Sequence, residues 1–498
     1  MYPGAFPETT LKYRLTTRCL QALTLQSCKF LLLYLPFICS MISSIADFQN
    51  PFFIGVAGSG MSALAQYLKG VGKNVSGSDR FFAPGVFNET QEKLEAEAIR
   101  CFVQDGSGIT KKTDLIVVST AIEDTVAEVQ KAKQMNIPIL RRSELLSLIA
   151  TSKKTIAVAG TSGKSTTSAM LFDILEHAGL QPSIISGAGL VSLIKKQKIG
   201  NAKVGAGEWL VIEADESDGS VVQYKPEIGL LLNIDKDHQE INELMSLFTI
   251  FKNNSKFFSV NQAHPLAAIL SQELQRDFSA DPNHYAGYMA TAFEQKGLGI
   301  HFKIAGVDFA MNLVGKHNME NALAAVAVAN GTGVSLETCA QALGKYEGIY
   351  RRHQVYGKKH GIWLVDDYAH NPVKCAAAIE ACQPVAPKLI AWFQPHGYKP
   401  TKFLRDDFVK EIANTLRPQD EIWMSEIFYA GGTAVKDISA DDLISDLKAM
   451  GRQAFFTENR NDFLNTVRPH LTHDCVLLLM GARDPSLEQF AKETWENL

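Results

Sequence analysis

The sequence lacks the marks of several large classes of protein. Its 498 residues include eight cysteines, which are scattered along the chain, and no two of them form a C-x-x-C pair. This argues against a disulfide framework and against structural zinc, and it fits a reducing cytosol. Lysine and arginine do not outnumber the acidic residues, because the formal net charge is −4. Neither a nucleic-acid partner nor an anionic membrane surface is therefore expected.

A long hydrophobic run is also missing. The apolar run at residues 30–42 is short for a membrane span and contains Pro36. Basic residues precede this run, so the beginning of the chain also resembles an export signal. We favour instead the interpretation that residues 1–49 are a disordered or artefactual extension, with Met41 as the true start. No stable membrane insertion is expected.

The remaining chain is long enough for several domains. Hydrophobic residues make up 46% of the sequence and charged residues 20%, which is typical of a soluble globular protein. A chain of this length is too long for a single core. Its motifs predict an α/β protein of three domains, at residues 50–150, 151–345 and 346–498. We predict a Rossmann-like first domain, a central P-loop ATPase-like domain and a Rossmann-like third domain.

The strongest motif predicts a phosphate site in the central domain. Residues 156–159 read as a buried strand, a glycine turn follows, and a helical pattern begins at Lys164. Backbone N–H groups and the helix dipole hold anions at such a junction. Lys164 would reach the outer phosphates, and the hydroxyl of Ser165 would ligate Mg²⁺. The loop is shorter than the common G-x-x-x-x-G-K-[ST], because Val158 stands where its first glycine would be. The predicted phosphate-binding residues are Gly160, Thr161, Ser162, Gly163, Lys164, Ser165 and Thr166.

Two further strands of the central domain end in polar residues. Five acidic residues lie between positions 208 and 218, and they repel one another unless cations neutralise some of them. We predict Glu213 and His238 as metal ligands beside the glycine loop. A solvated acidic loop and a structural histidine are the alternatives. A helix with a polar entry begins after Gly315, and we expect its His317, Asn318 and Asn321 either to contact an adenine or to cap the helix.

The first domain also contains a glycine loop between a strand and a helix. Its spacing is G-x-x-G-x-G, and Asp79 follows Gly60 by 19 residues, at the end of the next predicted strand. An acid at that place commonly meets a ribose hydroxyl. We predict a nucleotide-linked ligand, with an NAD site or a purely structural turn as alternatives. In the third domain, strands alternate with helices, which predicts a second open parallel sheet. Ligands collect at the carboxyl ends of such strands, where Asp366, Asp367, His370 and His396 fall.

Taken together, the motifs resemble those of the Mur ligase family. They occur in order over about residues 52–485: G-T-S-G-K-S-T-T, E-A-D-E-S-D, N-I-D-K-D-H, G-K-H-N-M-E-N-A, R-R and D-D-Y-A-H-N-P. The G-V-A-G-S-G-M-S and F-Q-P-H-G-Y segments are most similar to the branch that adds an amino acid, usually L-alanine, to UDP-N-acetylmuramate, or to its muropeptide-ligating relative. The resemblance implies a cytoplasmic, ATP- and Mg²⁺-dependent amide ligase of peptidoglycan synthesis or recycling. The enzyme would be a monomer or homodimer. Its substrates would be a UDP-N-acetylmuramate-type molecule and an amino acid.

The resemblance also implies roles for individual residues. Lys164 and Mg²⁺ would spread the charge of the transferring phosphoryl group. Ser165 and Glu213 would hold one Mg²⁺, and Glu213 and His238 would hold a second near the acyl phosphate. His317 and Asn321 would contact adenosine, with Asn318 supporting the helix entry. The residues that would close the third domain over ATP are Arg351 or Arg352 with Asp366 or Asp367. The residues that would bind the UDP-linked substrate or the amino acid are Gly58, Ser59, Gly60, Met61, Asp79, Ser119, His370 and His396.

Departures from the family pattern leave the amino acid open. The family branch usually carries arginine where Gly397 stands, and its S-S-A-I and N-P-E motifs are replaced from Ser119 onward. A second histidine that is common in the third domain is also absent. Lys252, 14 residues after His238, lies near a position that some members carboxylate, although the alanine-adding branch usually lacks that lysine. Folylpolyglutamate synthase is a rival without the first domain. A non-catalytic UDP-muramyl-binding relative is the other rival.

Overall fold

The protein is described by a computed structural model that covers residues 42–236, 239–429, 431 and 435–498. Residues 44–498 pack as one unit. Most of the predicted extension, with Met41, and the predicted metal ligand His238 lie outside the described residues. Within the described ranges, no helix is long and apolar enough to cross a membrane.

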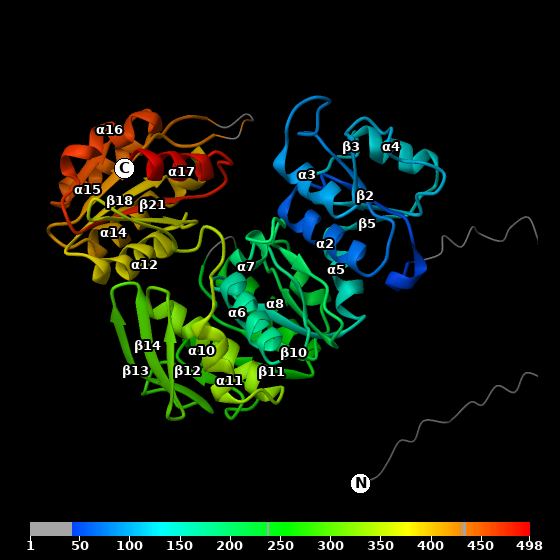
Figure 1. Cartoon of the computed structure of the whole chain (residues 1–498), viewed down its shortest axis with the longest axis horizontal. Helices are drawn as coiled ribbons and strands as arrows, with labels where there is room; N and C mark the ends of the chain where they lie inside the picture. The colour runs from blue at the N-terminus through cyan, green and yellow to red at the C-terminus, as the bar shows by residue number, and fades with distance from the viewer. Residues whose placement is uncertain (1–41, 237–238, 430, 432–434) are drawn as a thin grey trace, which may run out of the picture. The chain divides into compact units, whose positions relative to one another are not determined.

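The first part of the chain forms a parallel sheet with strand order β3-β2-β1-β4-β5 (Figure 1). Its buried strands are short, and the phenylalanine-rich β1 lies at the centre between β2 and β4. The glycine loop connects β1 to α2, so it lies at the carboxyl edge of the sheet. The elements are β1 (Pro51–Ile54), α2 (Ser59–Gly70), β2 (Ser76–Asp79), α3 (Glu89–Ala96), β3 (Arg100–Val103), β4 (Leu115–Val118), α4 (Ala127–Gln134), β5 (Ile139–Arg141) and α5 (Arg142–Ala150), preceded by the 3₁₀ turn η1 (Ile45–Asp47).

The central part is built on a second sheet, of order β11-β10-β6-β9-β7-β8. All its pairs are parallel except β7 with β8. Strands β9 and β10 flank β6 on either side, so their ends meet the glycine loop that follows β6. The elements are β6 (Lys154–Ala159), α6 (Lys164–His177), β7 (Ser183–Ile185), α7 (Val191–Ile194), β8 (Ala202–Lys203), β9 (Trp209–Glu213), η2 (Ser220–Gln223), β10 (Ile228–Leu231), α8 (Ile241–Asn254), β11 (Phe257–Val260) and α9 (Pro265–Ala268).

A further sheet, of order β12-β13-β14-β15, was not predicted from the sequence. Its long hairpins expose one face and bury the other, with Phe302 and Phe309 stacked at a centroid distance of 5.3 Å. Helices α10 and α11 pack between this sheet and α6, within one apolar core (Figure 1). The elements are β12 (Phe278–Ser279), β13 (Tyr288–Lys296), β14 (Gly299–Ile304), β15 (Val307–Met311), α10 (Lys316–Gly331) and α11 (Leu336–Gly344).

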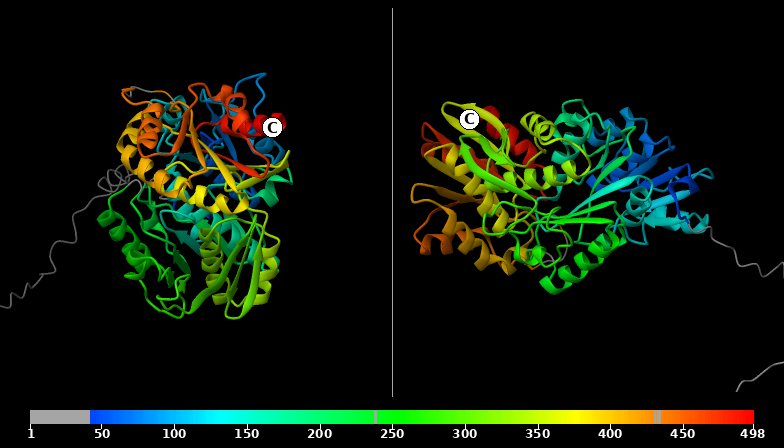
Figure 2. Two further views of the ribbon diagram at one scale, coloured as in Figure 1. Left: turned by 90° about the vertical axis from the view of Figure 1, so that its left-hand side faces the viewer. Right: turned by 90° about the horizontal axis from the view of Figure 1, so that it is seen from below.

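The last part forms a sheet of order β16-β17-β21-β18-β19-β20, with only the β16–β17 pair antiparallel among the described strands. Helices α12 and α14 pack against each other beside it (Figure 2). The elements are β16 (Gln354–Lys359), β17 (Ile362–Asp367), α12 (Pro372–Cys382), η3 (Gln383–Val385), β18 (Lys388–Gln394), α13 (Tyr398–Phe403), α14 (Arg405–Thr415), β19 (Glu421–Met424), α15 (Ala440–Ala449), β20 (Gln453–Phe456), η4 (Arg460–Asp462), α16 (Phe463–Val467), η5 (Arg468–His470), β21 (Cys475–Gly481) and α17 (Leu487–Asn497).

These sheets confirm the predicted fold class, an α/β protein with Rossmann-like outer parts and a P-loop-containing centre. The domain boundaries at 50–150, 151–345 and 346–498 stay predictions. Each part presents the carboxyl ends of its parallel strands at one edge, where polar residues interrupt the apolar runs. Parallel sheets bind their ligands at this edge.

Candidate active site

The glycine loop between β6 and α6 is held in shape by hydrogen bonds to the strand end beside it. Gly163 has a φ of 85°, in the left-handed region that favours glycine. The side chain of Asn233, which follows β10, accepts hydrogen bonds from the backbone N–H of Ser162 at 2.8 Å and from the hydroxyl of Thr161 at 2.9 Å. The backbone amides at the N-terminus of α6 are therefore fixed by a neighbouring strand. A fixed array of amides suits phosphate.

Lys164 lies at the centre of an acidic cluster. Its Nζ donates to Glu216 Oε2 at 2.6 Å and to the carbonyl of Gly160 at 2.7 Å, and it lies 3.8 Å from Asp215 Oδ1. Burial lowers the pKa of Lys164, but the attraction of Glu216 and Asp215 outweighs it, so the pKa is raised overall. The lysine therefore stays charged, and it can neutralise an anion that replaces the carboxylates.

Glu213 ends β9 beside the start of α6. Its Oε2 accepts the Ser165 hydroxyl at 2.8 Å, and its Oε1 accepts the Ser186 hydroxyl at 2.7 Å and the Gly187 amide at 2.6 Å. A carboxylate and a hydroxyl in contact are the protein ligands that a P-loop site offers to Mg²⁺. Among the described residues, no group of three or more His, Cys, Asp or Glu could hold a metal ion. The pair nevertheless fits Mg²⁺, which binds through one or two carboxylates together with water and substrate phosphates.

The second predicted metal position depends on His238, which lies outside the described residues. The segment before it reaches the glycine loop, because the backbone N–H of Asp235 donates to the Thr161 hydroxyl at 3.0 Å. The Asp235 carboxylate also contacts His264 Nε2 at 3.2 Å, and this hydrogen bond contributes most to lowering the pKa of Asp235. Lys252 is half-buried in the last turn of α8.

The entry of α10 borders the same cavity as the glycine loop. We call this cavity of about 480 Å³ the nucleotide-side cavity, because it lies against the loop that is predicted to bind phosphates. Asn321 Oδ1 accepts the Thr167 hydroxyl at 3.3 Å, whereas the amide of Asn318 donates to Val314 O at 2.7 Å, as expected of a group that supports the helix entry. Burial lowers the pKa of His317 to about 3, so this imidazole is neutral. Its ring lies 5.1 Å from that of His353, which the sequence reasoning missed.

The linker to the last sheet contributes two arginines with different surroundings. Arg351 is buried and donates to both oxygens of Asp366, from Nε at 2.8 Å and from Nη2 at 3.2 Å. Arg352 borders both the nucleotide-side cavity and an adjoining one, and its guanidinium lies 5.0 Å from the Tyr368 ring centroid. Asp367 accepts the backbone N–H of His353 at 2.7 Å. Arg351 and Asp366 therefore tie the linker to β17, and their predicted contact with ATP stays a prediction.

The adjoining cavity, of about 470 Å³, is bordered by the first glycine loop, the central sheet and the last sheet. Asn201 is buried where the first glycine loop meets the central sheet. Its Nδ2 donates to Ser59 O at 2.7 Å and to the Ser62 hydroxyl at 2.9 Å, and its Oδ1 accepts Gln66 Nε2 at 2.7 Å. Four residues border both cavities, so the two adjoin. These residues are Ser165, Arg352, Tyr368 and Arg483.

Four other predicted substrate residues lie at or beside the first glycine loop but do not border the adjoining cavity themselves. Gly58, Gly60 and Met61 lie at the N-terminus of α2 beside Ser59, which borders the adjoining cavity. The buried carboxylate of Asp79 accepts the backbone N–H groups of Ala57 and Phe81, so it fixes the glycine loop. A contact of Asp79 with uridine stays a prediction.

The remaining predicted residues divide between the cavity and its surroundings. Ser119 follows β4 and borders neither cavity. His370 borders the nucleotide-side cavity, and burial lowers its pKa to about 4. The ring of His396 lies 5.6 Å away from that of His370, although His396 borders neither cavity.

Sequence reasoning missed several residues of this edge besides His353. Glu216 and Asn233 stand inside recognised motifs but were not assigned roles, although each binds the glycine loop or its lysine. Asn201 and Arg483 lie in no motif that local spacing could identify, because their places depend on contacts between distant segments.

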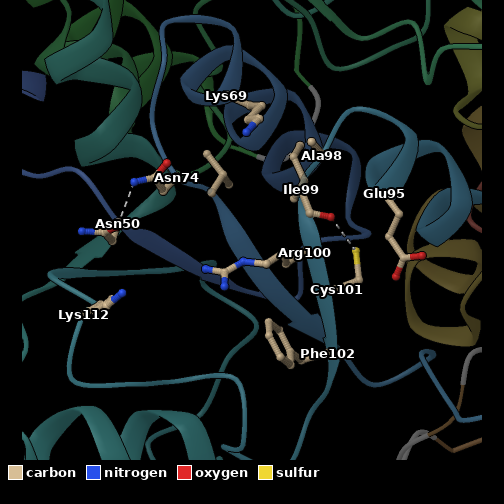
Figure 3. A pocket seen from close by; sticks show the side chains of 11 residues that line it. Asn50, Lys69, Asn74, Glu95, Ala98, Ile99, Arg100, Cys101, Phe102 and Lys112 are labelled. Atoms are coloured by element: carbon tan, nitrogen blue, oxygen red, sulfur yellow. Dashed lines mark hydrogen bonds between the residues drawn. The ribbon is translucent and has the colours of Figure 1, made fainter.

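A cavity of about 780 Å³ lies elsewhere, at the amino ends of β1, β2 and β3 (Figure 3). Asn74 donates to Asn50 at 3.1 Å there, and Lys69, Arg100 and Lys112 surround it. The first glycine loop leaves the opposite ends of the same strands. Because ligands of parallel sheets bind at the carboxyl ends, this cavity is not part of the candidate site.

Comparison with known proteins covers all three parts of the chain. Residues 52–154 match the model of the Mur ligase family catalytic domain, residues 158–329 the Mur ligase middle domain, and residues 351–483 the Mur ligase glutamate ligase domain.

Relatives similar to this chain include the UDP-N-acetylmuramate–L-alanine ligases of Carboxydothermus hydrogenoformans and Acidithiobacillus ferrooxidans. Each is 33% identical over 86% of this chain, which spans 93% and 94% of the two relatives. The crystal structure of a UDP-N-acetylmuramate-alanine ligase from Thermotoga maritima has a TM-score of 0.74 at 23% identity, covering 90% of this chain and 98% of that one. A murein peptide ligase from Psychrobacter arcticus has a TM-score of 0.62 at 19% identity with the same coverage. These two structures share the fold.

Proposed function

The chain belongs to the Mur ligase family, and we propose that it is an ATP-dependent ligase that joins L-alanine to the carboxylate of UDP-N-acetylmuramate. The product would be an amide, formed in peptidoglycan synthesis in the cytoplasm. The observation that carries the proposal is that two cavities adjoin and share four bordering residues, one cavity lying against Lys164 and the other against the first glycine loop. A phosphate donor and a nucleotide-linked acid can therefore meet at Ser165.

The chemistry we propose has two steps. The muramyl carboxylate attacks the γ-phosphorus of ATP, the bond to the bridging oxygen breaks, and ADP leaves. The amine of the amino acid then attacks the acyl phosphate carbon, loses a proton, and expels inorganic phosphate. Both steps move negative charge between oxygens, so positioned positive charge lowers their barriers.

The residues of this chain divide the work of these steps. The amides of Gly163, Lys164 and Ser165 would hold the phosphates, and the Lys164 side chain would exchange Glu216 for phosphate oxygens. Ser165 and Glu213 would hold Mg²⁺, which supplies charge neutralisation at the transferring phosphoryl group. Arg352, at the junction of the cavities, would contact the phosphoryl group from the opposite side. Closure of the last sheet over the site would exclude water, which otherwise hydrolyses an acyl phosphate.

The base of ATP would lie at the entry of α10. Asn321 offers an amide there, and His317 is neutral and can accept a hydrogen bond from an exocyclic amine. The N-terminus of α2, residues 58–61, would face the UDP diphosphate, because Ser59 borders the adjoining cavity and Asn201 binds the Ser59 carbonyl. The predicted monomer or homodimer state, the absence of a nucleic-acid partner and the state of Lys252 stay predictions.

A second candidate is ligation of a peptide rather than an amino acid. The residue that favours it is Gly397, because the resemblance implies an arginine there in the alanine-adding branch and glycine has no side chain to bind an amino-acid carboxylate. The test measures phosphate release and amide product with ATP, Mg²⁺ and UDP-N-acetylmuramate, adding each amino acid or a tripeptide with a free N-terminal amine separately. L-Alanine should support product formation. Product with the tripeptide alone would select the second candidate, and product with neither would refute ligation.

A variant separates the roles of the two cavities. Lys164→Ala should abolish turnover while it leaves binding of the UDP-linked substrate within about twofold, because no described contact joins Lys164 to the first sheet. The measurements are product formation and calorimetric binding of UDP-N-acetylmuramate. Loss of both together would contradict the assignment of the cavities.

A further inference from the structure

Arg483 is held in an unusual backbone conformation at the end of β21. Its φ is 69°, in the left-handed region that arginine rarely adopts. Such a residue persists when its neighbours determine its conformation, and it often lies at a functional site. The neighbours of Arg483 are indeed fixed, because Asp484 is buried and accepts Arg460 Nη1 at 2.6 Å, while Gly481 O accepts Arg351 Nη2 at 3.0 Å.

Besides Arg483, two arginines at this edge are each paired with an aspartate. Arg351 binds Asp366, and Arg460 binds Asp484. Arg483 is exposed, and in the described part of the chain it has no hydrogen bond or ion pair. It borders both cavities, so it brings a positive charge to their junction.

The junction is where the amino acid must bind. The phosphate donor would enter from the side of Lys164 and the muramyl carboxylate from the side of Ser59, so the acyl phosphate carbon would lie between them. The attacking amine must reach that carbon, and a single carbon separates the amine of an α-amino acid from its carboxylate. That carboxylate therefore also lies near the junction and needs a cation there.

The neighbouring strand end does not supply this cation. Strand β18 pairs with β21 in parallel, with Gln394 opposite Gly481, so the segment after Gln394 lies beside Arg483. That segment, Pro-His-Gly-Tyr, contains neither lysine nor arginine, and Lys399, which follows it, borders neither cavity. Arg352, the other arginine at the junction, stacks on the Tyr368 ring and follows the buried Arg351.

We propose that Arg483 binds the α-carboxylate of the incoming amino acid and so selects an acceptor that carries this group beside its amine. The inference rests on the proposed ligase function. The inference adds a specificity-determining residue to the proposed ligase. An acceptor whose carboxylate is blocked as an amide loses the charge-assisted hydrogen bonds to the guanidinium.

The test compares L-alanine with L-alaninamide in the full-length enzyme and in Arg483→Gly. Glycine adopts a positive φ without strain, so this variant should fold with an unchanged or raised melting temperature. The KM for L-alanine should rise by about 10- to 100-fold, the range expected for lost charged hydrogen bonds. The KM values for L-alaninamide, ATP and the UDP-linked substrate should change less than about twofold. Arg483→Lys should recover part of the preference for L-alanine.

His360→Gly is the matched control. His360 is also exposed at a positive φ, 51°, in the last part of the chain, and it borders neither cavity. This variant should leave all the KM values unchanged. An unchanged KM for L-alanine in Arg483→Gly would overturn the proposal. So would a fall in kcat that is equal for L-alanine and its amide, because this indicates a contact with phosphate.

The wild type alone distinguishes failure of the function from failure of this inference. A wild type that ligates only a peptide, whose amine-bearing residue has no free carboxylate, keeps the ligase function but overturns the role of Arg483. A wild type that ligates no acceptor refutes the proposed function and this role with it.

Discussion

Replacement of Gly163 by alanine tests the geometry of the phosphate loop. The φ of Gly163 is 85°, and an added Cβ would lie 2.5 Å from Asn321 Oδ1 and 3.1 Å from Leu232 Cδ1. A left-handed conformation costs alanine about 1–2 kcal/mol. Forcing a methyl group into a packed site costs about 1–3 kcal/mol more. We expect Gly163→Ala to lower the free energy of unfolding by about 2–5 kcal/mol in total.

The same helix provides the matched control. Gly179 follows the C-terminus of α6 with a φ of 76°, and an added Cβ would meet nothing within 4 Å. Gly179→Ala therefore has the backbone cost without the clash. The difference between the two variants isolates the contact with Asn321 and Leu232, and it should be about 1–3 kcal/mol.

Denaturant unfolding gives this difference, and calorimetric titration gives the affinity for ATP with Mg²⁺. Gly163→Ala should weaken ATP binding by at least about tenfold, because the methyl group displaces Asn321 and blocks the approach of phosphate to the loop. Gly179→Ala should bind ATP normally. If the two variants are equally stable and bind ATP equally well, the loop is not the phosphate site and the reasoning is refuted. Adding Asn321→Ala to Gly163→Ala should recover stability without recovering ATP affinity.

Three further predictions concern the contacts around the two cavities. Asn201→Ala removes the donor to the Ser59 carbonyl, so it should raise the KM for the UDP-linked substrate several-fold, with an unchanged KM for ATP, in steady-state assays. Arg351→Ala leaves the buried Asp366 unpaired and should lower the free energy of unfolding by about 3–5 kcal/mol in denaturant titrations, whereas a merely exposed pair would cost under about 1 kcal/mol. Burial lowers the pKa of His317 from 6.5 to about 3, so its contribution to stability is present above pH 6.5 and is lost as the pH falls towards 3. The stability difference between wild type and His317→Gln should therefore fall by about 1.4 kcal/mol per pH unit below the unfolded pKa, and a constant difference would contradict a neutral imidazole.

The sequence predicts most of the parallel sheets because their strands are buried on both faces. Such strands are continuous apolar runs, and polar residues follow immediately where each run reaches the ligand edge, as at Glu213 and Asp367. The β12–β15 sheet escaped prediction because its strands alternate buried and exposed residues, as Gly299–Ile304 does. This weaker pattern lies between two strong motifs.

The residues of the candidate site also divide into those that local sequence predicts and those that it does not. Lys164, Ser165 and Glu213 were predictable because a strand, a turn and a helix N-terminus place them by local geometry alone. Asn201 and Arg483 were not, since each acts through segments that are distant in the sequence. Arg351 was assigned to ATP from its motif, but the contact that occupies it, with Asp366, exists only in the folded chain.

The contacts of the phosphate loop explain how an acidic edge can bind a polyanion. Lys164 is occupied by Glu216, and the Ser165 hydroxyl by Glu213, so phosphate cannot bind until these pairs separate. When Lys164 leaves Glu216 for a phosphate, its positive charge stays paired with a negative one. The carboxylates left without the lysine then repel one another. Mg²⁺ that arrives with the nucleotide offsets this repulsion, with Glu213 already beside Ser165 as its ligand. The acidic cluster therefore favours the metal–nucleotide complex over free nucleotide, because free nucleotide would bring its negative charge without a cation to compensate the carboxylates.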